Sequence, residues 1–361
     1  MRTDMVNASR RGAGSSGVLC VATSNGVAVT RVIGALVPPS TREESEAAED
    51  LPSLGVSPSV EMRNGYTVVF GLEEDAVDEY LYFQFQAAFT AFGGERVLRV
   101  STVRLQVTSN VAHMLQSVDV EAAAVIMAKE AVVDVVDGMG VEAAKTAVNA
   151  RLQAIAKTWG DQVKVTASGR VNVVPAQLAR LPHLTYHLLH GPLLGPILNH
   201  ADDYSLIRSL FLRSGVTDSV RILAPTLLLC PSSEGEQYRA VPLEDLSLLP
   251  DSILLLDHHT HVFVWSGSKA SGADFDPVRS NATSHAMQWA SGRFPCPDVM
   301  LFSEGESMAR WLVSRLDPSH RDAAGGGIMG AVRGFFNAQF VPTDDDSMGE
   351  WMSKLRLSAS Q

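Results

Sequence analysis

The sequence predicts a multidomain α+β protein with a β-sandwich, an all-α domain and an α/β domain. Its 361 residues exceed the length of one ordinary domain. Strand patterns recur over residues 17–110, and alanine-rich helical patterns follow over residues 111–218. Strand and helix patterns then alternate over residues 219–361, which is typical of a compact α/β domain.

The predicted β-sandwich begins with two β-rich strands in residues 17–36, placed about the turn sequence Ser-Asn-Gly at 24–26, a strong hairpin signal. Residues 38–58 are polar and acidic without periodicity, so we expect a long loop there. Residues 1–16 are rich in glycine, serine and arginine, and we expect them to be disordered. Further strands are expected at 66–70, 80–91 and 96–108.

The remaining elements are expected from hydrophobic periodicity and from helix start and stop residues. Helices of the all-α domain are expected at 118–136, 141–159, 175–190 and 204–213. In the α/β domain, strands are expected at 222–223, 226–230, 253–256 and 261–265, and helices at 284–291, 303–318 and 347–357.

Charge and cysteine content indicate which kind of partner and which cellular compartment to expect. The chain has 29 basic and 40 acidic residues, and a net charge of −11 argues against nucleic acid as the main partner. Cys20, Cys230 and Cys296 show no paired spacing, which favours reduced thiols in a cytosolic chain. No signal peptide and no apolar run of about 18 residues is visible, so we expect a soluble protein.

Four groups of residues could bind a metal or a phosphate, and each has a simpler interpretation. Histidines at 183, 187 and 190 share a helix face, but no carboxylate or cysteine stands near them in the sequence. Histidines at 258, 259 and 261 fit a strand end, and the aspartates at 344–346 fit charge at the start of a helix. The glycines at 325–327 lack the residues of a phosphate loop. We therefore predict no metal, no cofactor and no complete active site.

The sequence of residues 303–318 contains signals for both the start and the end of a helix. Ser303 is a good N-cap, and Glu306 three residues later would complete a capping box. Asp317 precedes a proline and would end the helix. Ser303 and Glu306 are thus expected to hold this helix in place.

The faces of this predicted helix differ. One side carries an apolar set that is expected to pack, namely Met308, Trp311, Leu312 and Leu316. Arg315 lies among these residues and would have to extend past them to reach water. Arg310 projects to the opposite side, where an arginine is ordinarily a solvated surface residue.

The segment also resembles a known sequence. Residues 304–318 are similar to the Gly-Gly-Ser-Gln-Ala-Arg-Phe-Leu-Leu-Ser-Lys-x-Asn-Pro-Ser segment in the GTPase-activating subunit of the inner COPII vesicle coat. Other segments agree with that family in order and spacing along most of the chain, namely 119–127, 181–188, 252–257, 262–267, 293–297 and 343–345.

The resemblance implies a β-sandwich, a helical domain and a gelsolin-like domain. It implies that the chain activates a Sar-type small GTPase with Arg310 as an arginine finger supplied in trans, supported by Trp311 and Leu312. It further implies that the chain acts at the cytosolic face of the endoplasmic reticulum. The implied partners are a cargo-selecting COPII subunit and outer-coat subunits, with no cofactor in this chain.

The sequence departs from the family in two respects. No segment matches the family's zinc finger or its large trunk domain, which implies a C-terminal piece of a longer subunit or a shortened relative. Asp298 stands where the family has an arginine. Two alternatives stay open at this point: the cargo-selecting COPII paralogue, and a gelsolin-like module that binds actin or calcium.

Overall fold

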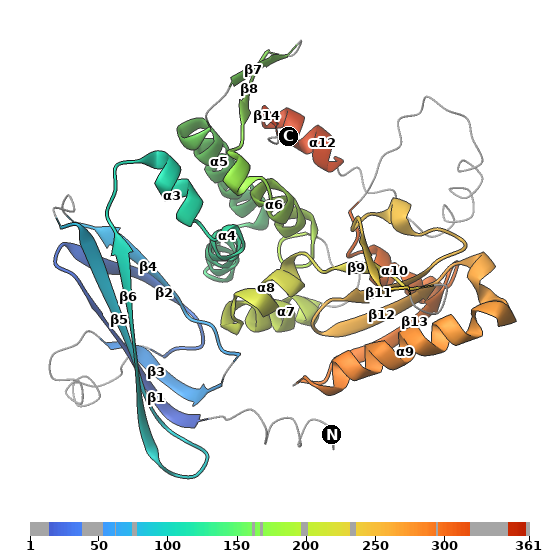
Figure 1. Ribbon diagram of the computed structural model, residues 1–361, viewed down its shortest axis with the longest axis horizontal. Helices are drawn as coiled ribbons and strands as arrows, with labels where there is room; N and C mark the ends of the chain where they lie inside the picture. The colour runs from blue at the N-terminus through green and yellow to red at the C-terminus, as the bar shows by residue number, and fades with distance from the viewer. Residues whose placement is uncertain are drawn as a thin grey trace. The chain divides into compact units, whose positions relative to one another are not determined.

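The structure, a computed structural model, describes residues 14–37, 53–61, 63–73, 78–160, 163–166, 169–195, 201–231, 236–293, 295–317 and 346–358. The chain divides into two compact units, residues 1–133 with 209–219 and residues 134–208 with 220–361 (Figure 1). The unit boundaries at 133 and 208 fall inside the predicted all-α domain, so the three-domain division stays a prediction. Expectations for residues 1–13, 325–327 and 344–345 lie outside the described residues.

The first unit contains the predicted β-sandwich. One antiparallel sheet has the strand order β3-β1-β5-β6, formed by Ser53–Val60, Gly14–Thr23, Tyr80–Thr90 and Arg96–Gln106. The second sheet pairs β2 (Val27–Ile33) with β4 (Thr67–Leu72), also antiparallel. Phe70 of β4 contacts Phe83 and Phe85 of β5, with ring centroids 4.7 and 6.3 Å apart. These aromatic contacts join the inner faces of the two sheets.

Three expectations for this unit were wrong. The strands on either side of the turn at 24–26 do not form a hairpin, because β1 and β2 belong to different sheets. Gly26, with a φ of 75°, and the bond from Thr23 Oγ1 to Val27 O (2.8 Å) turn the chain from one sheet to the other. The expected loop at 38–58 contains the start of β3, and β1 begins at Gly14, inside the segment expected to be disordered.

The helical part of the chain contains helices where the sequence predicted them, but the one expected at 175–190 begins only at Leu181, and helices at 111–117 and 216–223 were not predicted. Helix α5 occupies Val141–Trp159 as predicted and ends at Gly160, whose N–H is bonded to Ala156 O. The other helices, in chain order, are α3 (Val111–Ser117), α4 (Val120–Val136), α6 (Leu181–His190), α7 (Ala201–Arg213) and α8 (Val216–Leu223). By length and composition, no single described helix could cross a bilayer, although α3 and α4 pass that test together as a pair bent by 81°.

The predicted all-α domain also contains strands. In addition, one strand predicted for the α/β domain is part of a helix. Strands β7 (Val163–Thr166) and β8 (Gly169–Val173) pair antiparallel, and β14 (Leu357–Ser358) joins β8 in parallel. The apolar pair at 222–223 ends α8 and does not begin a strand. Two apolar residues in sequence fit either structure, so periodicity alone could not decide between them.

The second unit contains the predicted α/β domain, built on a five-stranded mixed sheet with the order β10-β9-β11-β12-β13. Its strands are Arg239–Val241, Leu227–Leu229, Ile253–Asp257, His261–Ser266 and Asp298–Ser303. β13 runs parallel to β12, and the other pairs are antiparallel.

The two faces of this sheet carry separate apolar cores. Helix α9 (Asp276–Ser291) buries Ala282 and Ala286 against one face, together with inward residues of β11 and β12. On the other face, Leu312 packs with Leu254 and Leu256 of β11 and with aromatic residues of β12. The alternation of side chains along β11 and β12 therefore supplies both cores, and the segment after β13 covers one of them.

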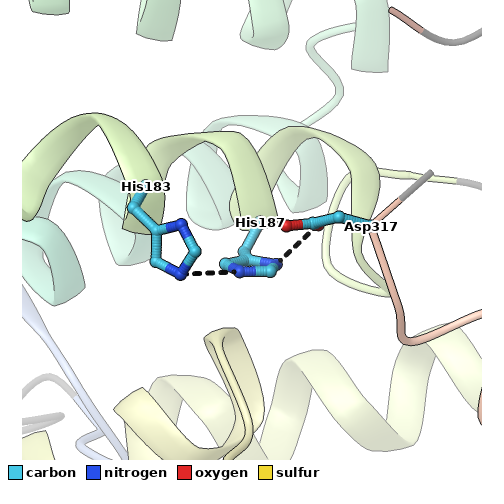
Figure 2. Close-up of side chains that lie close together, drawn as sticks. All are labelled: His183, His187 and Asp317. Carbon is cyan, nitrogen blue, oxygen red and sulfur yellow. Dashed lines mark hydrogen bonds and ion pairs between the residues drawn. The ribbon is translucent and has the colours of Figure 1, made fainter. Parts of the chain in front are cut away.

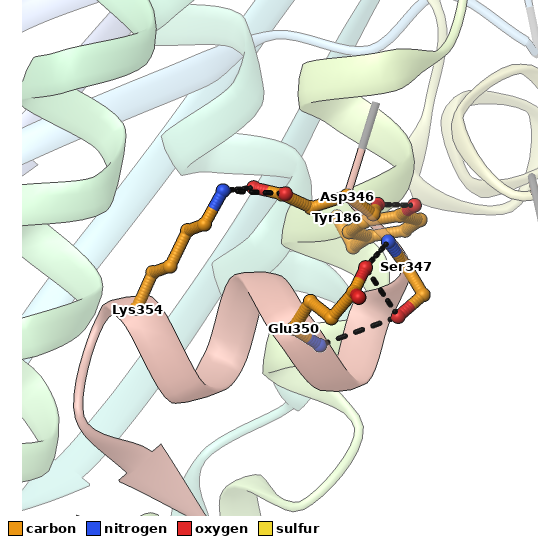
Figure 3. A network of polar contacts seen from close by, with 5 residues as sticks. All are labelled: Tyr186, Asp346, Ser347, Glu350 and Lys354. Carbon is orange, nitrogen blue, oxygen red and sulfur yellow. Dashed lines mark hydrogen bonds and ion pairs between the residues drawn. The ribbon is translucent and has the colours of Figure 1, made fainter. Parts of the chain in front are cut away.

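The C-terminal helix α12 (Met348–Lys354) has the expected helical character and a well-formed start. Ser347 is its N-cap and makes a capping box with Glu350 (Figure 3). Asp346 lies just outside the helix, where its carboxylate pairs with Lys354 and its backbone carbonyl accepts the Tyr186 hydroxyl at 2.6 Å. These contacts attach the end of the chain to α6.

Candidate functional site

The segment that carries Arg310 is shorter and less regular than the predicted helix. β13 ends at Ser303, a turn follows in which Gly305 has a φ of 86°, and a 3₁₀ turn at Ser307–Ala309 leads into α10 (Arg310–Val313). The expected capping box is not formed. Ser303 pairs with Ser266 in the β12–β13 ladder, and Glu306 makes no side-chain cap bond. A turn over residues 304–306 separates Ser303 from the first helical residue, Ser307, so Ser303 is too far away to cap it.

Only some of the side chains that were predicted to pack are buried in this segment. Leu312 is fully buried, Leu316 is 8% exposed and Trp311 is half-buried, as expected. Met308 was expected to pack but is 41% exposed. Ala309 is buried instead, because the 3₁₀ turn rotates the chain relative to a continuous α-helix.

Arg315 was expected to reach water, but it is only 8% exposed. Its Nη1 donates to Trp311 O at 2.9 Å and to Ser314 Oγ at 2.6 Å, and its guanidinium lies over the Phe263 ring, 5.8 Å from the centroid. Burial lowers the pKa of Arg315 to about 10, against an opposing effect of Asp203. The side chain therefore remains charged at neutral pH and is held inside the domain.

Arg310 is exposed, as the sequence predicted, and stands at the first position of α10. Among the residues that the structure describes, none makes a hydrogen bond or ion pair with its guanidinium. The nearby carboxylate of Glu304 is engaged elsewhere, accepting the backbone N–H of Ser268 at 2.7 Å. No described residue therefore competes with an external group for this guanidinium.

The chain on either side of Arg310 is fixed to the sheet. At the start, the N–H of Glu304 donates to Ser266 O at 2.8 Å. At the end, the N–H of Asp317 donates to Leu243 O at 2.8 Å, and Asp317 O accepts from Asp245 N at 3.2 Å. With Leu312 buried between these attachments, the backbone at Arg310 has little freedom to move.

A second constellation lies at the end of the same segment. His187 Nδ1 is 3.0 Å from Asp317 Oδ1, and His187 Nε2 is 3.2 Å from His183 Nε2 (Figure 2). His190, the third histidine of the predicted face, is not part of this group, since its Nδ1 is bonded to Tyr186 O. The carboxylate that the sequence seemed to lack comes from Asp317, which no local spacing could indicate.

The other histidine group forms the turn between β11 and β12, in agreement with the interpretation as a strand end. His258 is 1% exposed, and burial lowers its pKa well below the usual value, with smaller contributions from Arg315 and the neighbouring histidines. The metal-like clusters found among the described residues do not include these histidines. They are part of the packing of the turn.

The turn is held by a buried ion cluster that sequence reasoning did not single out. Asp257 at the end of β11 accepts both Nη atoms of Arg293, and Arg221 Nε lies 3.2 Å from the same carboxylate. The backbone N–H of His259 also donates to Asp257 at 3.1 Å. Asp257 and Arg293 both belong to segments of the sequence resemblance, and their role here is structural.

Comparisons with known proteins agree with this architecture. The profile of the Sec23/Sec24 beta-sandwich domain matches residues 14–108, and that of the Sec23/Sec24 helical domain matches residues 119–221. Protein transport protein SEC23 A from Arabidopsis thaliana is 32% identical over 372 aligned positions, which cover 98% of this chain and 41% of that protein.

A solved structure shows the same fold over nearly the whole chain. The crystal structure of the human COPII-coat protein Sec24c aligns with a TM-score of 0.73 at 17% identity, covering 98% of this chain and 47% of that one. The chain thus spans less than half the length of both relatives. Two family domains in the correct order, followed by a third domain that is present in the relatives, place the chain in the Sec23/Sec24 family.

Proposed function

We propose that this chain is a COPII coat component of the GTPase-activating type and that Arg310 acts as an arginine finger on a Sar-type small GTPase. The observation that carries the proposal is an exposed arginine without a described partner, held on a segment that is attached to a sheet at both ends. An arginine finger neutralises charge that develops on the transferred phosphoryl group. It needs an unengaged guanidinium and a rigid base. No described residue engages Arg310, and its segment is attached to the sheet at both ends.

Two further observations support Arg310 over other arginines of the same domain. Arg315, five residues later, is buried and bonded to the backbone of its own helix, so it has no path to a partner. Arg293 and Arg221 are engaged by Asp257. The sequence similarity to SEC23 A, at 32% identity along 98% of this chain, supports the same type of coat subunit.

The proposed partners follow from the family. The chain would bind the GTP form of a Sar-type GTPase, a cargo-selecting COPII subunit and outer-coat subunits at the cytosolic face of the endoplasmic reticulum. This chain spans 41% of the length of SEC23 A. Binding to the GTPase is therefore measured separately from acceleration of hydrolysis.

The proposal predicts that Arg310→Ala abolishes GTPase activation without abolishing binding. The measurement is single-turnover GTP hydrolysis by a Sar-type GTPase at saturating concentrations of this chain. Removal of an arginine finger lowers the hydrolysis rate by about 10³-fold or more. Arg310→Lys should recover little of this, since a lysine lacks the planar fork of donors.

Arg239→Ala is the matched control, because it removes an exposed arginine of strand β10 in the same domain. It should leave both binding and hydrolysis unchanged. Full acceleration by the Arg310→Ala variant would refute the finger assignment. Failure of every variant and of the wild-type chain to accelerate hydrolysis, despite measured binding to the GTPase, would refute the activating role of this chain.

A further inference from the structure

We propose that His183 and His187, supported by Asp317, form a binding site for a divalent transition metal, with Zn²⁺ as the ion that fits best. The two histidines lie one turn apart on the same face of α6, and Asp317 reaches them from the end of the Arg310 segment (Figure 2). One candidate ligand atom from each of the three side chains lies within 4.8 Å of the others. The proposal concerns metal binding alone and does not depend on GTPase activation.

The spacing of the two imidazoles fits a pair of zinc ligands. Histidines at i and i+4 on one helix face are a known arrangement for binding zinc. The Nε2 atoms of His183 and His187 are 3.2 Å apart. In a tetrahedral site with Zn–N bonds of about 2.0–2.1 Å, two ligand nitrogens lie about 3.3 Å apart, with the metal about 1.2 Å off the line between them. The two nitrogens therefore already have the separation that a zinc ion requires.

Asp317 orients His187 in the manner of a supporting residue at a metal site. Its Oδ1 lies 3.0 Å from His187 Nδ1, on the side of the ring opposite to His183. A carboxylate in this position fixes the proton on Nδ1 and leaves the Nε2 lone pair for a metal. His187 is 4% exposed and Asp317 8% exposed, so water competes little for this hydrogen bond.

Metal binding requires that both imidazoles offer a lone pair on Nε2. For both Nε2 atoms to coordinate, the proton between them moves to His183 Nδ1. This is a change of tautomer, and no net proton is released.

Zinc fits this donor set better than hard divalent cations do. It is borderline-soft, which suits imidazole, whereas Mg²⁺ and Ca²⁺ require oxygen ligands. Two protein nitrogens leave two tetrahedral positions for water, and the half-buried His183 lies on the accessible side. Among the thiols, burial raises the pKa of Cys230 to about 12, which keeps it protonated and a poor ligand. Cys296, which is only half-buried, is the main competing thiol.

The test is zinc binding to the full chain in a Cys296→Ser background. Isothermal titration with ZnCl₂ gives stoichiometry and affinity, after chelator treatment and desalting. Co²⁺ substitution then reports tetrahedral coordination by its visible absorption. We expect one ion per chain, loss of binding in His183→Asn and His187→Asn, and binding weakened by about 10- to 100-fold in Asp317→Asn. His113→Asn removes an exposed histidine of α3 and should bind like the parent.

His187 is buried, so its variant must be shown to fold. Circular dichroism without metal gives the melting temperature of each variant, and His183→Asn, at a half-buried position, is the safer probe. A zinc-dependent rise in melting temperature that only the parent and His113→Asn show would support the site. The proposal is overturned if no zinc binds, or if folded His183→Asn binds zinc as tightly as the parent. The three side chains would then form only a hydrogen-bonded chain.

Discussion

At the scale of single residues, the first unit contains a buried lysine whose effect on the free energy of unfolding can be measured. Lys129 of α4 is 2% exposed, and its Nζ donates to Ser214 O at 2.7 Å. Burial lowers the pKa of this lysine to about 8. One hydrogen bond to a carbonyl does not replace the hydration that an ammonium group loses on burial. The charged form of Lys129 therefore lowers the free energy of unfolding.

The pKa of Lys129 fixes the direction of a pH dependence. Between the folded value of about 8 and the unfolded value of 10.5, the unfolded chain binds more protons than the folded chain, so stability rises with pH in this window. The gain between pH 7.5 and 9.5 is about 2 kcal/mol.

The comparison variant is Lys129→Met, which keeps the apolar stem and removes the charge. Urea unfolding of both proteins, measured at pH 7.5, 8.5 and 9.5, should show the extra rise only in the wild type. Parallel pH profiles for the two proteins would contradict a lowered pKa of Lys129 in the folded chain.

At the scale of elements, the Arg310 segment is held by few apolar residues, and they are not all those that a helical wheel selects. Leu312 is fully buried in the core below the sheet, whereas Met308 is 41% exposed. Both side chains were predicted to pack. The difference arises because the segment starts as a 3₁₀ turn, which changes the angle between successive side chains.

This difference predicts unequal costs of two similar truncations. Leu312→Ala removes a fully buried side chain and should lower the unfolding free energy by about 2–5 kcal/mol. Met308→Ala removes an exposed one and should change it by no more than about 0.5 kcal/mol. Chemical denaturation of the two variants checks this. Equal losses would mean that Met308 packs as the helical wheel suggested.

At the scale of the whole molecule, charge decides which partners are excluded. The net charge of −11 opposes binding to nucleic acid. One local exception is a cavity of about 420 Å³ whose lining includes Lys157, Arg170 and Arg356. Three exposed cations can make only a few phosphate contacts, which give little affinity at physiological salt.

We therefore predict no binding to nucleic acid at micromolar protein concentrations and 150 mM salt. Fluorescence anisotropy with a labelled single-stranded and a labelled double-stranded probe measures this. Binding that is lost when Lys157, Arg170 and Arg356 are all changed to glutamine would contradict the prediction and would place nucleic acid at the cavity.

The sequence by itself determined the classes of structure and much of the secondary structure. The α5 boundaries agree with its flanking glycines, and the strands β5, β11 and β12 lie where period or apolar runs predicted them. These signals are local, because they depend on backbone conformation and on which face of an element is apolar. The exposure of Arg310 was predictable for the same reason.

Only the tertiary structure decided which of the local sequence signals form the predicted cap or hairpin. The pattern Ser-x-x-Glu occurs at Ser303 and at Ser347, yet of these two only Ser347 forms a capping box, because the helical turn after Ser303 starts only at Ser307. At the turn 24–26 the chain passes from one sheet to the other, because β1 and β2 pair with other strands and not with each other. Asp317 meets His187 through folding across 130 residues. Pairing, register and long-range contact are properties of the packed chain, and no short window of sequence contains them.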